Sequence, residues 1–269
     1  MTPDITAATP SSDVARPGSV WLVVLSAIVA VVGGFLGSGA VVGTPIAEAA
    51  DGALSATATL VAPAGPAFSI WSVIYLGLIA YAVWQALPAQ RRSERQRALR
   101  VPVAVTMLLN AAWITVVQFG QVFLSVVVIV ALLASLAFVF ARLIAAPRTT
   151  AVDTVITDGT MGLYLGWVSI ATVANMSAWL ASIGVESAAT VWAVVVLIVA
   201  AAVGLFLATV SAGRIAPALS LSWGLGWAAQ GRLSGEVLNT TVGWTAAVAA
   251  TVVLVGTIAV RARRTATSR

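Results

Sequence analysis

The chain has 269 residues, of which 60% are hydrophobic and only 9% charged, and its mean hydropathy is +1.03. A soluble domain has roughly 25% charged residues, so this composition excludes an ordinary soluble protein and indicates a polytopic membrane protein. The chain has neither cysteine nor histidine, which excludes disulfides and most zinc, haem-ligand and Ser-His-Asp chemistry. The net charge of +5 does not indicate nucleic-acid binding, because the arginines lie between apolar segments.

Eight apolar segments have about the 17–25 residues that a membrane-spanning helix needs. The first exceeds the ~7–15-residue apolar stretch of a signal peptide and follows a tail that is not positively charged, so we expect a retained helix. The seventh is short and contains Pro217. The predicted fold is an all-α polytopic transmembrane bundle. The segments cover residues 19–43, 67–88, 101–118, 121–145, 157–182, 187–210, 213–229 and 238–260.

The arginines between these segments predict the orientation of the chain. With the N-terminus in the cytoplasm, thirteen of the fourteen basic residues fall in cytoplasmic segments, and only Arg232 falls outside. This asymmetry follows the positive-inside rule and predicts a multi-pass protein of the cell membrane with both termini cytoplasmic. The basic stretch 89–100 is expected to be a cytoplasmic loop that anchors the topology, with binding of anionic lipid headgroups as the alternative.

One face of the fifth segment carries aromatic and amide side chains. In the sequence YLGWVSIATVANMSAW, a helix turning about 100° per residue places Tyr164, Trp167, Ala171, Asn175 and Trp179 within an arc of about 120°. The small residues leave a hollow, and the large residues wall it. Lipid offers no hydrogen-bond partner to an amide, so we expect this face to line a pocket or to contact another helix.

The second and third segments repeat the same arrangement. Phe68, Trp71 and Tyr75 share one helical face, and Asn110 shares a face with Trp113. Aromatic residues also anchor helix ends at the membrane interface, and a single Asn can join two helices with about 0.6–2 kcal/mol. Three helices with the same arrangement favour a pocket for a flat, largely apolar ligand.

The three motifs together resemble those of the TspO/MBR family, the tryptophan-rich sensory or translocator proteins. The patterns Phe-x-x-Trp-x-x-x-Tyr, Asn-x-x-Trp and Tyr-x-x-Trp-x-x-x-Ala-x-x-x-Asn occur in the family's order. The resemblance covers about residues 19–182 and implies five helices around a pocket beneath the loop that joins helices one and two. The ligand-binding residues that it implies are Phe68, Trp71, Tyr75, Asn110, Trp113, Tyr164, Trp167, Ala171 and Asn175.

The resemblance also implies a function. Family members bind porphyrins, sterols or benzodiazepine-type drugs, so we expect a membrane receptor, sensor or carrier for a flat hydrophobic ligand. A porphyrin or haem-type molecule is the leading candidate, and no protein-bound cofactor is required. The tryptophans of the motifs would stack on the ligand, and the tyrosines and asparagines would supply hydrogen bonds. Light-dependent degradation of bound porphyrin, which is said of some members, is an enzymatic alternative.

Glycine spacing bears on the oligomeric state. GxxxG pairs occur at Gly33 and Gly37, and at Gly162 and Gly166, and a further pair spans residues 39–43. Such spacing allows helices to approach closely, either within one chain or between two. Because family members often dimerise, we expect a homodimer in the lipid bilayer.

Three features depart from the family pattern. VAPAGPAF leads into the second helix without the Trp that many members have there, and Gly162 and Leu163 stand where many members have Pro before the Tyr. Three further helices also follow, in which Trp223 and Trp227 either fill space or extend a pocket. The predicted organisation is a cytoplasmic tail over residues 1–18, a TspO-like bundle over 19–182, three additional helices over 183–260 and a basic tail over 261–269.

Asp158 is the candidate for a different function. An acid inside a membrane segment can be a proton site, so a proton-coupled secondary transporter of a small amphipathic solute is an alternative. Asp153 and Asp158 also stand where a helix begins, where carboxylates cap backbone amides. The sequence has no GxSxG or GK[ST] motif, so it predicts no catalytic residues.

Overall fold

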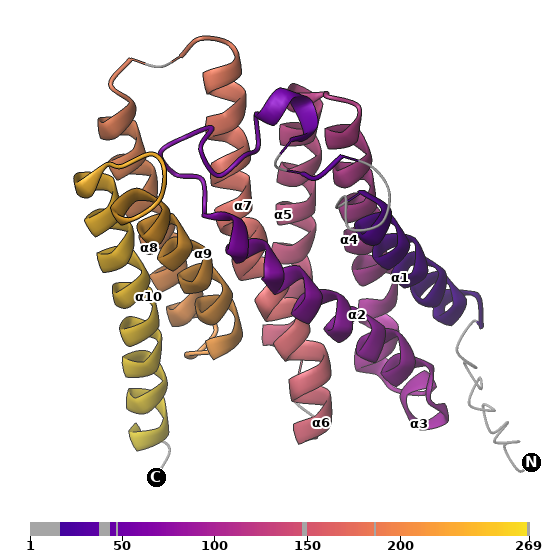
Figure 1. The fold of residues 1–269 in the computed structure, drawn as a ribbon. Helices are drawn as coiled ribbons and strands as arrows, with labels where there is room; N and C mark the ends of the chain where they lie inside the picture. The colour runs from indigo at the N-terminus through magenta and orange to yellow at the C-terminus, as the bar shows by residue number, and fades with distance from the viewer. Residues whose placement is uncertain (1–16, 38–43, 47, 147–149, 186, 268–269) are drawn as a thin grey trace, which may run out of the picture.

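The structure is a computed structural model, and it describes residues 17–37, 44–46, 48–146, 150–185 and 187–267. Eight long helices make up most of this part of the chain (Figure 1). They are α1 (Pro17–Gly37), α2 (Ile70–Ala86), α4 (Glu94–Gln118), α5 (Val122–Ala145), α7 (Thr160–Ser182), α8 (Ala189–Val210), α9 (Ile215–Leu233) and α10 (Thr240–Thr267). The short helices are η1 (Ala49–Gly52), η2 (Gly65–Ser69), α3 (Pro88–Arg91), α6 (Ala151–Asp153) and the π-helical η3 (Thr154–Gly159).

The helices pack in an order that differs from their order in the chain. α1 packs on α4, α4 on α5 and α5 on α7, while α2 lies diagonally across the bundle and contacts α1 and α7 (Figure 1). α9 then joins α7 to α10, and α8 packs mainly on α10. The first five long helices and the last three are therefore connected chiefly through the α7–α9 contact.

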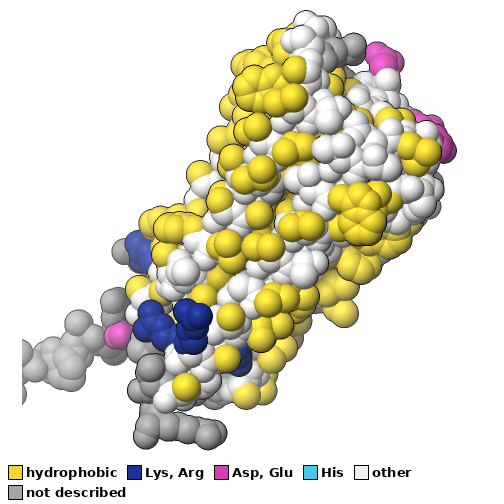
Figure 2. All heavy atoms as spheres, turned by 90° about the vertical axis from the view of Figure 1, so that its left-hand side faces the viewer, with side chains coloured by type: hydrophobic (Ala, Val, Ile, Leu, Met, Phe, Trp, Pro, Cys, Tyr) yellow, Lys and Arg dark blue, Asp and Glu magenta, His cyan; other side chains and the backbone are white. Residues whose placement is uncertain are grey.

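The two ends of the bundle differ. α1 begins and α10 ends at the same end, which we call the terminal end (Figure 1). Residues 48–64, which we call the lid segment, lie at the opposite end, the lid end. Every described arginine except Arg232 belongs to a helix end or turn at the terminal end, and the basic side chains visible in Figure 2 gather there.

Seven of the described helical stretches are long and apolar enough to span a membrane, and α9 is the long helix that is not among them. The sequence predicted eight spans, of which the seventh was short and contained Pro217. α9 still carries the chain from the terminal end back to the lid end, and α7 and α10 cover much of its surface. A helix surrounded by protein needs less hydrophobic surface than one surrounded by lipid. The protein is thus a multi-pass membrane protein in which α9 is less apolar than the seven spanning helices and packs against α7 and α10.

The basic stretch 89–100 was predicted to be a loop, and this prediction is wrong. The stretch forms α3 and the first turns of α4, whose N-cap is Ser93. Arg95 and Arg100 are buried there rather than solvated. Hydropathy alone ends the predicted helix at the first charges, yet Arg, Gln, Glu, Leu and Ala are all good helix formers.

The glycine pairs make contacts within the chain. A Cβ atom added at Gly37 would lie 2.1 Å from the side chain of Ile114 on α4. A Cβ atom at Gly166 would lie 2.1 Å from the carbonyl oxygen of Pro217 on α9. The pair within residues 39–43 lies outside the described residues. The homodimer therefore stays a prediction, and these two glycine pairs serve to bring helices of one chain together.

Gly166→Ala should separate α7 from α9. The added methyl group meets backbone that cannot rotate away, and such overpacking costs about 1–3 kcal/mol. Thermal unfolding of purified protein in detergent measures the effect. Gly226→Ala on α9 is the control, because nothing lies within 4 Å of its added Cβ. Equal stability of the two variants would contradict the close contact.

Candidate functional site

Aromatic side chains of α2 and α7 form one continuous cluster. Trp71 stacks on Tyr75 with ring centroids 5.3 Å apart, and it meets Tyr164 and Trp167 edge-on at 5.8 and 6.3 Å. Phe68, at the end of η2, meets Trp167 edge-on at 5.7 Å. Edge-to-face and stacked contacts at these distances are favourable. The two motifs predicted to face a pocket therefore face each other.

Hydrogen bonds connect the third motif to both neighbours. Trp113 Nε1 donates to Asn175 Oδ1 at 2.7 Å, and Asn175 Nδ2 donates to Ser125 Oγ of α5 at 2.9 Å. Asn110 Nδ2 donates to the Tyr75 hydroxyl at 3.0 Å. Asn175 thus joins α4, α5 and α7, which gives the buried amide the interhelix partners that its position requires.

A cavity lies among these helices, and we call it the aromatic box. Its walls include every predicted site residue except Tyr75 and Tyr164, which lie behind Trp71 in the aromatic cluster. Tyr164 is fully buried, and its hydroxyl donates to the Thr106 carbonyl at 3.2 Å. The predicted residues in the wall are Phe68, Trp71, Asn110, Trp113, Trp167, Ala171 and Asn175.

The lid segment closes the aromatic box at the lid end. Ala53, Leu54, Ser55, Thr59 and Ala62 contribute to its wall. The cavity volume of the aromatic box is about 50 Å³. Small-molecule sites usually measure about 300–1,000 Å³, so the box is nearly closed in this conformation.

Three polar atoms in the wall of the box lack a hydrogen-bond partner among the described residues. They are Trp167 Nε1, Asn110 Oδ1 and Thr59 Oγ1, and all three are buried. Turning the Asn110 amide over would leave its nitrogen unpaired instead. An unpartnered buried polar atom costs about 1–3 kcal/mol, so the box offers a donor, an amide and a hydroxyl to a ligand.

Sequence reasoning missed the parts of the box that have no motif. Ser125, Ile129 and Leu132 of α5 are close to the asparagine or line the cavity, but their segment looks like any apolar helix. The family resemblance implied a loop over the pocket, but the individual lid residues that line the box could not be identified, because a loop has no periodicity. A buried Asn175 does indicate that a polar partner must exist somewhere on a neighbouring helix.

α9 supports the lid segment and η2 from outside the box. Trp223 Nε1 donates to the Ala67 carbonyl at 2.9 Å, and the backbone N–H of Ala64 donates to the Trp227 carbonyl at 3.2 Å. Trp223 and Trp227 meet edge-on at 5.7 Å, and neither lines the box. Of the two alternatives for this tryptophan pair, the structure shows packing.

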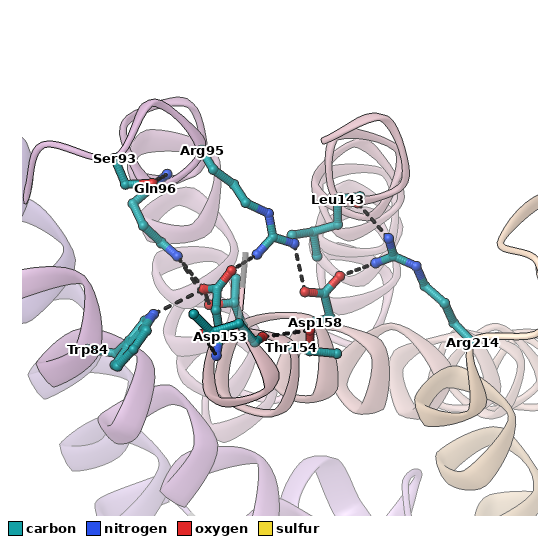
Figure 3. Close-up of polar contacts among 11 residues, drawn as sticks. Trp84, Ser93, Arg95, Gln96, Leu143, Asp153, Thr154, Asp158 and Arg214 are labelled. Carbon is teal, nitrogen blue, oxygen red and sulfur yellow. Dashed lines mark hydrogen bonds and ion pairs between the residues drawn. The ribbon is translucent and has the colours of Figure 1, made fainter. Parts of the chain in front are cut away.

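A second polar site, which we call the ion cluster, lies at the terminal end (Figure 3). Arg95 of α4 bridges Asp153 and Asp158, and Arg214 binds the other oxygen of Asp158. Trp84 Nε1 also donates to Asp153 Oδ1, at 3.0 Å. All four charged side chains are at least nine-tenths buried. The cluster joins α4 to the beginning of α9.

The capping interpretation of the two aspartates is wrong. Thr150 caps α6 by accepting from the backbone N–H of Asp153, while both aspartates direct their carboxylates at arginines. A π-helical turn makes this possible. Residues five apart lie about 140° apart around an α-helix, whereas a turn with i→i+5 bonds brings them close to one face.

Comparison with known proteins agrees with this geometry. A family model described as TSPO-like protein matches residues 20–259. The match continues through α8, α9 and α10, so the limit of about residue 182 placed on the resemblance was too short. No curated protein and no solved structure gives a significant match. The three motifs, the box beneath the lid segment and the family match lead to one conclusion: the chain belongs to the TSPO-like protein family.

Proposed function

We propose that the protein is a membrane receptor, sensor or carrier for a flat hydrophobic ligand, with a porphyrin as the leading candidate and a sterol-like molecule as the second. The observation that carries the proposal is the aromatic box itself. Its wall is apolar and aromatic, yet Trp167, Asn110 and Thr59 hold unpartnered polar atoms there. An apolar cavity with a few convergent polar groups is typical of a ligand site.

Binding requires the box to open. The cavity of about 50 Å³ is far too small for a tetrapyrrole. We infer that the lid segment moves, because η1 contains two left-handed residues, Ala50 and Asp51, and little regular structure surrounds it. A ligand would therefore bind an open conformation and pay the cost of populating it.

The proton-coupled transporter has less support. Asp158 does not line the box, and both of its oxygens are bound by guanidinium groups. Porphyrin photodegradation is supported by the family resemblance alone. The one-sided distribution of arginines supports a cytoplasmic terminal end in the cell membrane.

Equilibrium binding of protoporphyrin IX to the protein in lipid nanodiscs tests the proposal. We expect saturable binding at one site, after subtraction of the porphyrin that partitions into empty discs. The affinity should be the same with Asp158→Asn, provided that this variant is folded, because the residue lies outside the box. Signal that rises linearly and equals that of empty discs would contradict the proposed function.

A further inference from the structure

A second, larger cavity lies between α7 and α8 at the lid end, and we call it the side cavity. By the same measure as the aromatic box, it encloses about 570 Å³. Its walls come from the end of α7, the beginning of α8 and residues 57–61 of the lid segment. This volume lies within the range of about 300–1,000 Å³ that small-molecule sites occupy.

The rim of the side cavity is exposed and apolar. Trp192 is 61% exposed, and Leu180 and Val185 are exposed beside it. In a membrane protein such a surface faces lipid, and tryptophan is favoured near the membrane interface. Thr57, Thr59, Ser177 and Ser187 add hydroxyl groups to an otherwise apolar lining. A molecule with an apolar body and a few polar atoms matches this lining.

One stretch of chain separates the two cavities. Thr59 lines both the aromatic box and the side cavity, and its hydroxyl has no hydrogen-bond partner among the described residues. The lid segment at about residues 57–61 and the end of α7 thus lie between the two cavities, and Thr59 is the residue that lines both.

A single arginine holds this partition in place. Arg232, near the end of α9, donates to the Thr59 carbonyl at 3.1 Å and to the Ala56 carbonyl at 2.6 Å. Its side chain is 1% exposed. Arg232 is also the one described arginine at the lid end. These two hydrogen bonds from a buried charge fix the lid segment to α9, which does not belong to the first five long helices.

We propose that the side cavity is the entrance through which a flat hydrophobic ligand passes from the bilayer into the aromatic box, with residues 57–61 as the gate and Arg232 as its latch. The inference rests on the proposed function, since it needs a ligand that binds in the box. It gives two of the last three helices a role: α8 forms one wall of the entrance, and α9 holds the gate.

Blocking the entrance should slow exchange without changing affinity. Val196 lines the side cavity, so Val196→Trp fills it. Stopped-flow mixing of protoporphyrin IX with protein in nanodiscs gives the association and dissociation rate constants. We expect both to fall about tenfold, as a barrier raised by about 1.4 kcal/mol requires, while the Kd stays constant. Val195→Trp is the matched control, because Val195 is an exposed neighbour outside the cavity.

Releasing the latch should have the opposite effect. Arg232→Met replaces the arginine with an unbranched apolar side chain and removes both hydrogen bonds to the lid carbonyls. We expect both rate constants to rise. Slower exchange in this variant would overturn the role of Arg232, and if the variant fails to fold, the two tryptophan variants still decide whether the side cavity is the entrance.

The outcomes separate this inference from the proposed function. If wild type binds porphyrin while the Val196 and Val195 variants exchange at the same rate, the entrance is wrong and the binding function stands. If Val196→Trp abolishes equilibrium binding, the side cavity is the binding site rather than a passage, which also overturns the entrance. If wild type binds no porphyrin, both proposals fail together.

Discussion

Trp167→Ala is expected to weaken protoporphyrin binding by about 30-fold to 1,000-fold, the equivalent of about 2–4 kcal/mol, as buried tryptophans at the centre of a binding site commonly do. Trp167 lines the cavity, is 1% exposed, packs edge-on against Phe68 and Trp71, and has a buried Nε1 atom without a hydrogen-bond partner among the described residues. Its removal takes away both the wall and a donor. Equilibrium titration in nanodiscs measures the loss.

The same substitution enlarges a cavity that is too small, which makes the result informative. If a larger cavity volume were all that binding required, Trp167→Ala would bind porphyrin more tightly than wild type. That result would contradict the proposed role of the Trp167 ring. Trp244→Ala is the control, because Trp244 is 64% exposed on α10, outside both cavities. Truncating a buried Trp costs about 3–5 kcal/mol of stability, so circular dichroism must establish that both variants are folded.

Asp158→Asn is expected to destabilise the protein by about 3–5 kcal/mol, because breaking a buried ion pair leaves an uncompensated charge. Asp158 binds Arg95 and Arg214, and the substitution leaves the ion cluster with two guanidinium groups and one carboxylate. Unfolding by SDS in mixed micelles, followed by circular dichroism, measures the free energy.

Glu94→Gln provides the control for this experiment. Glu94 pairs with Arg97 at 3.8 Å on the surface, and its side chain is 92% exposed. A surface pair of this kind contributes about 0–1 kcal/mol. If both variants unfold alike, the cluster is not a structural link. The double variant Asp158→Asn with Arg214→Gln should recover part of the loss, because it removes one of the stranded charges.

Hydropathy and helical periodicity predicted most of the fold. Long apolar runs such as residues 122–145 can hardly be anything but a membrane helix, and this prediction agrees with α5 within a residue. The predictions failed where charge and burial coincide. The beginning of α4 was missed because Arg95 and Arg100 are buried against partners that the sequence does not place nearby. α9 falls below the apolarity of the other long helices because protein covers it.

The candidate site was predictable where it follows a helix and not elsewhere. The helical faces that carry Trp71, Trp113 and Trp167 follow from a period of 3.6 residues. The structure places all three side chains around the aromatic box. The family resemblance implied that the loop between helices one and two lies over the pocket, but no local pattern gives the position of this loop, which depends on Arg232, 173 residues from Thr59 in the chain. The side cavity depends on how α7 and α8 diverge, which no local pattern encodes.

The π-helical turn at Thr154–Gly159 has a consequence for the length of this chain segment. It accommodates one residue more than an α-helix would between the same two points. The extra residue changes the angle about the helix axis between the side chains before the turn and those after it. The ion pair with Arg95 fixes the direction of the Asp153 side chain. The contact with Trp71 on α2 fixes the direction of the helical face that carries Trp167. A chain one residue shorter here would turn one of the two by about 100° relative to the other. The ion cluster and the aromatic box could then not both form, so sequence length between residues 153 and 160 is itself a constraint on this protein.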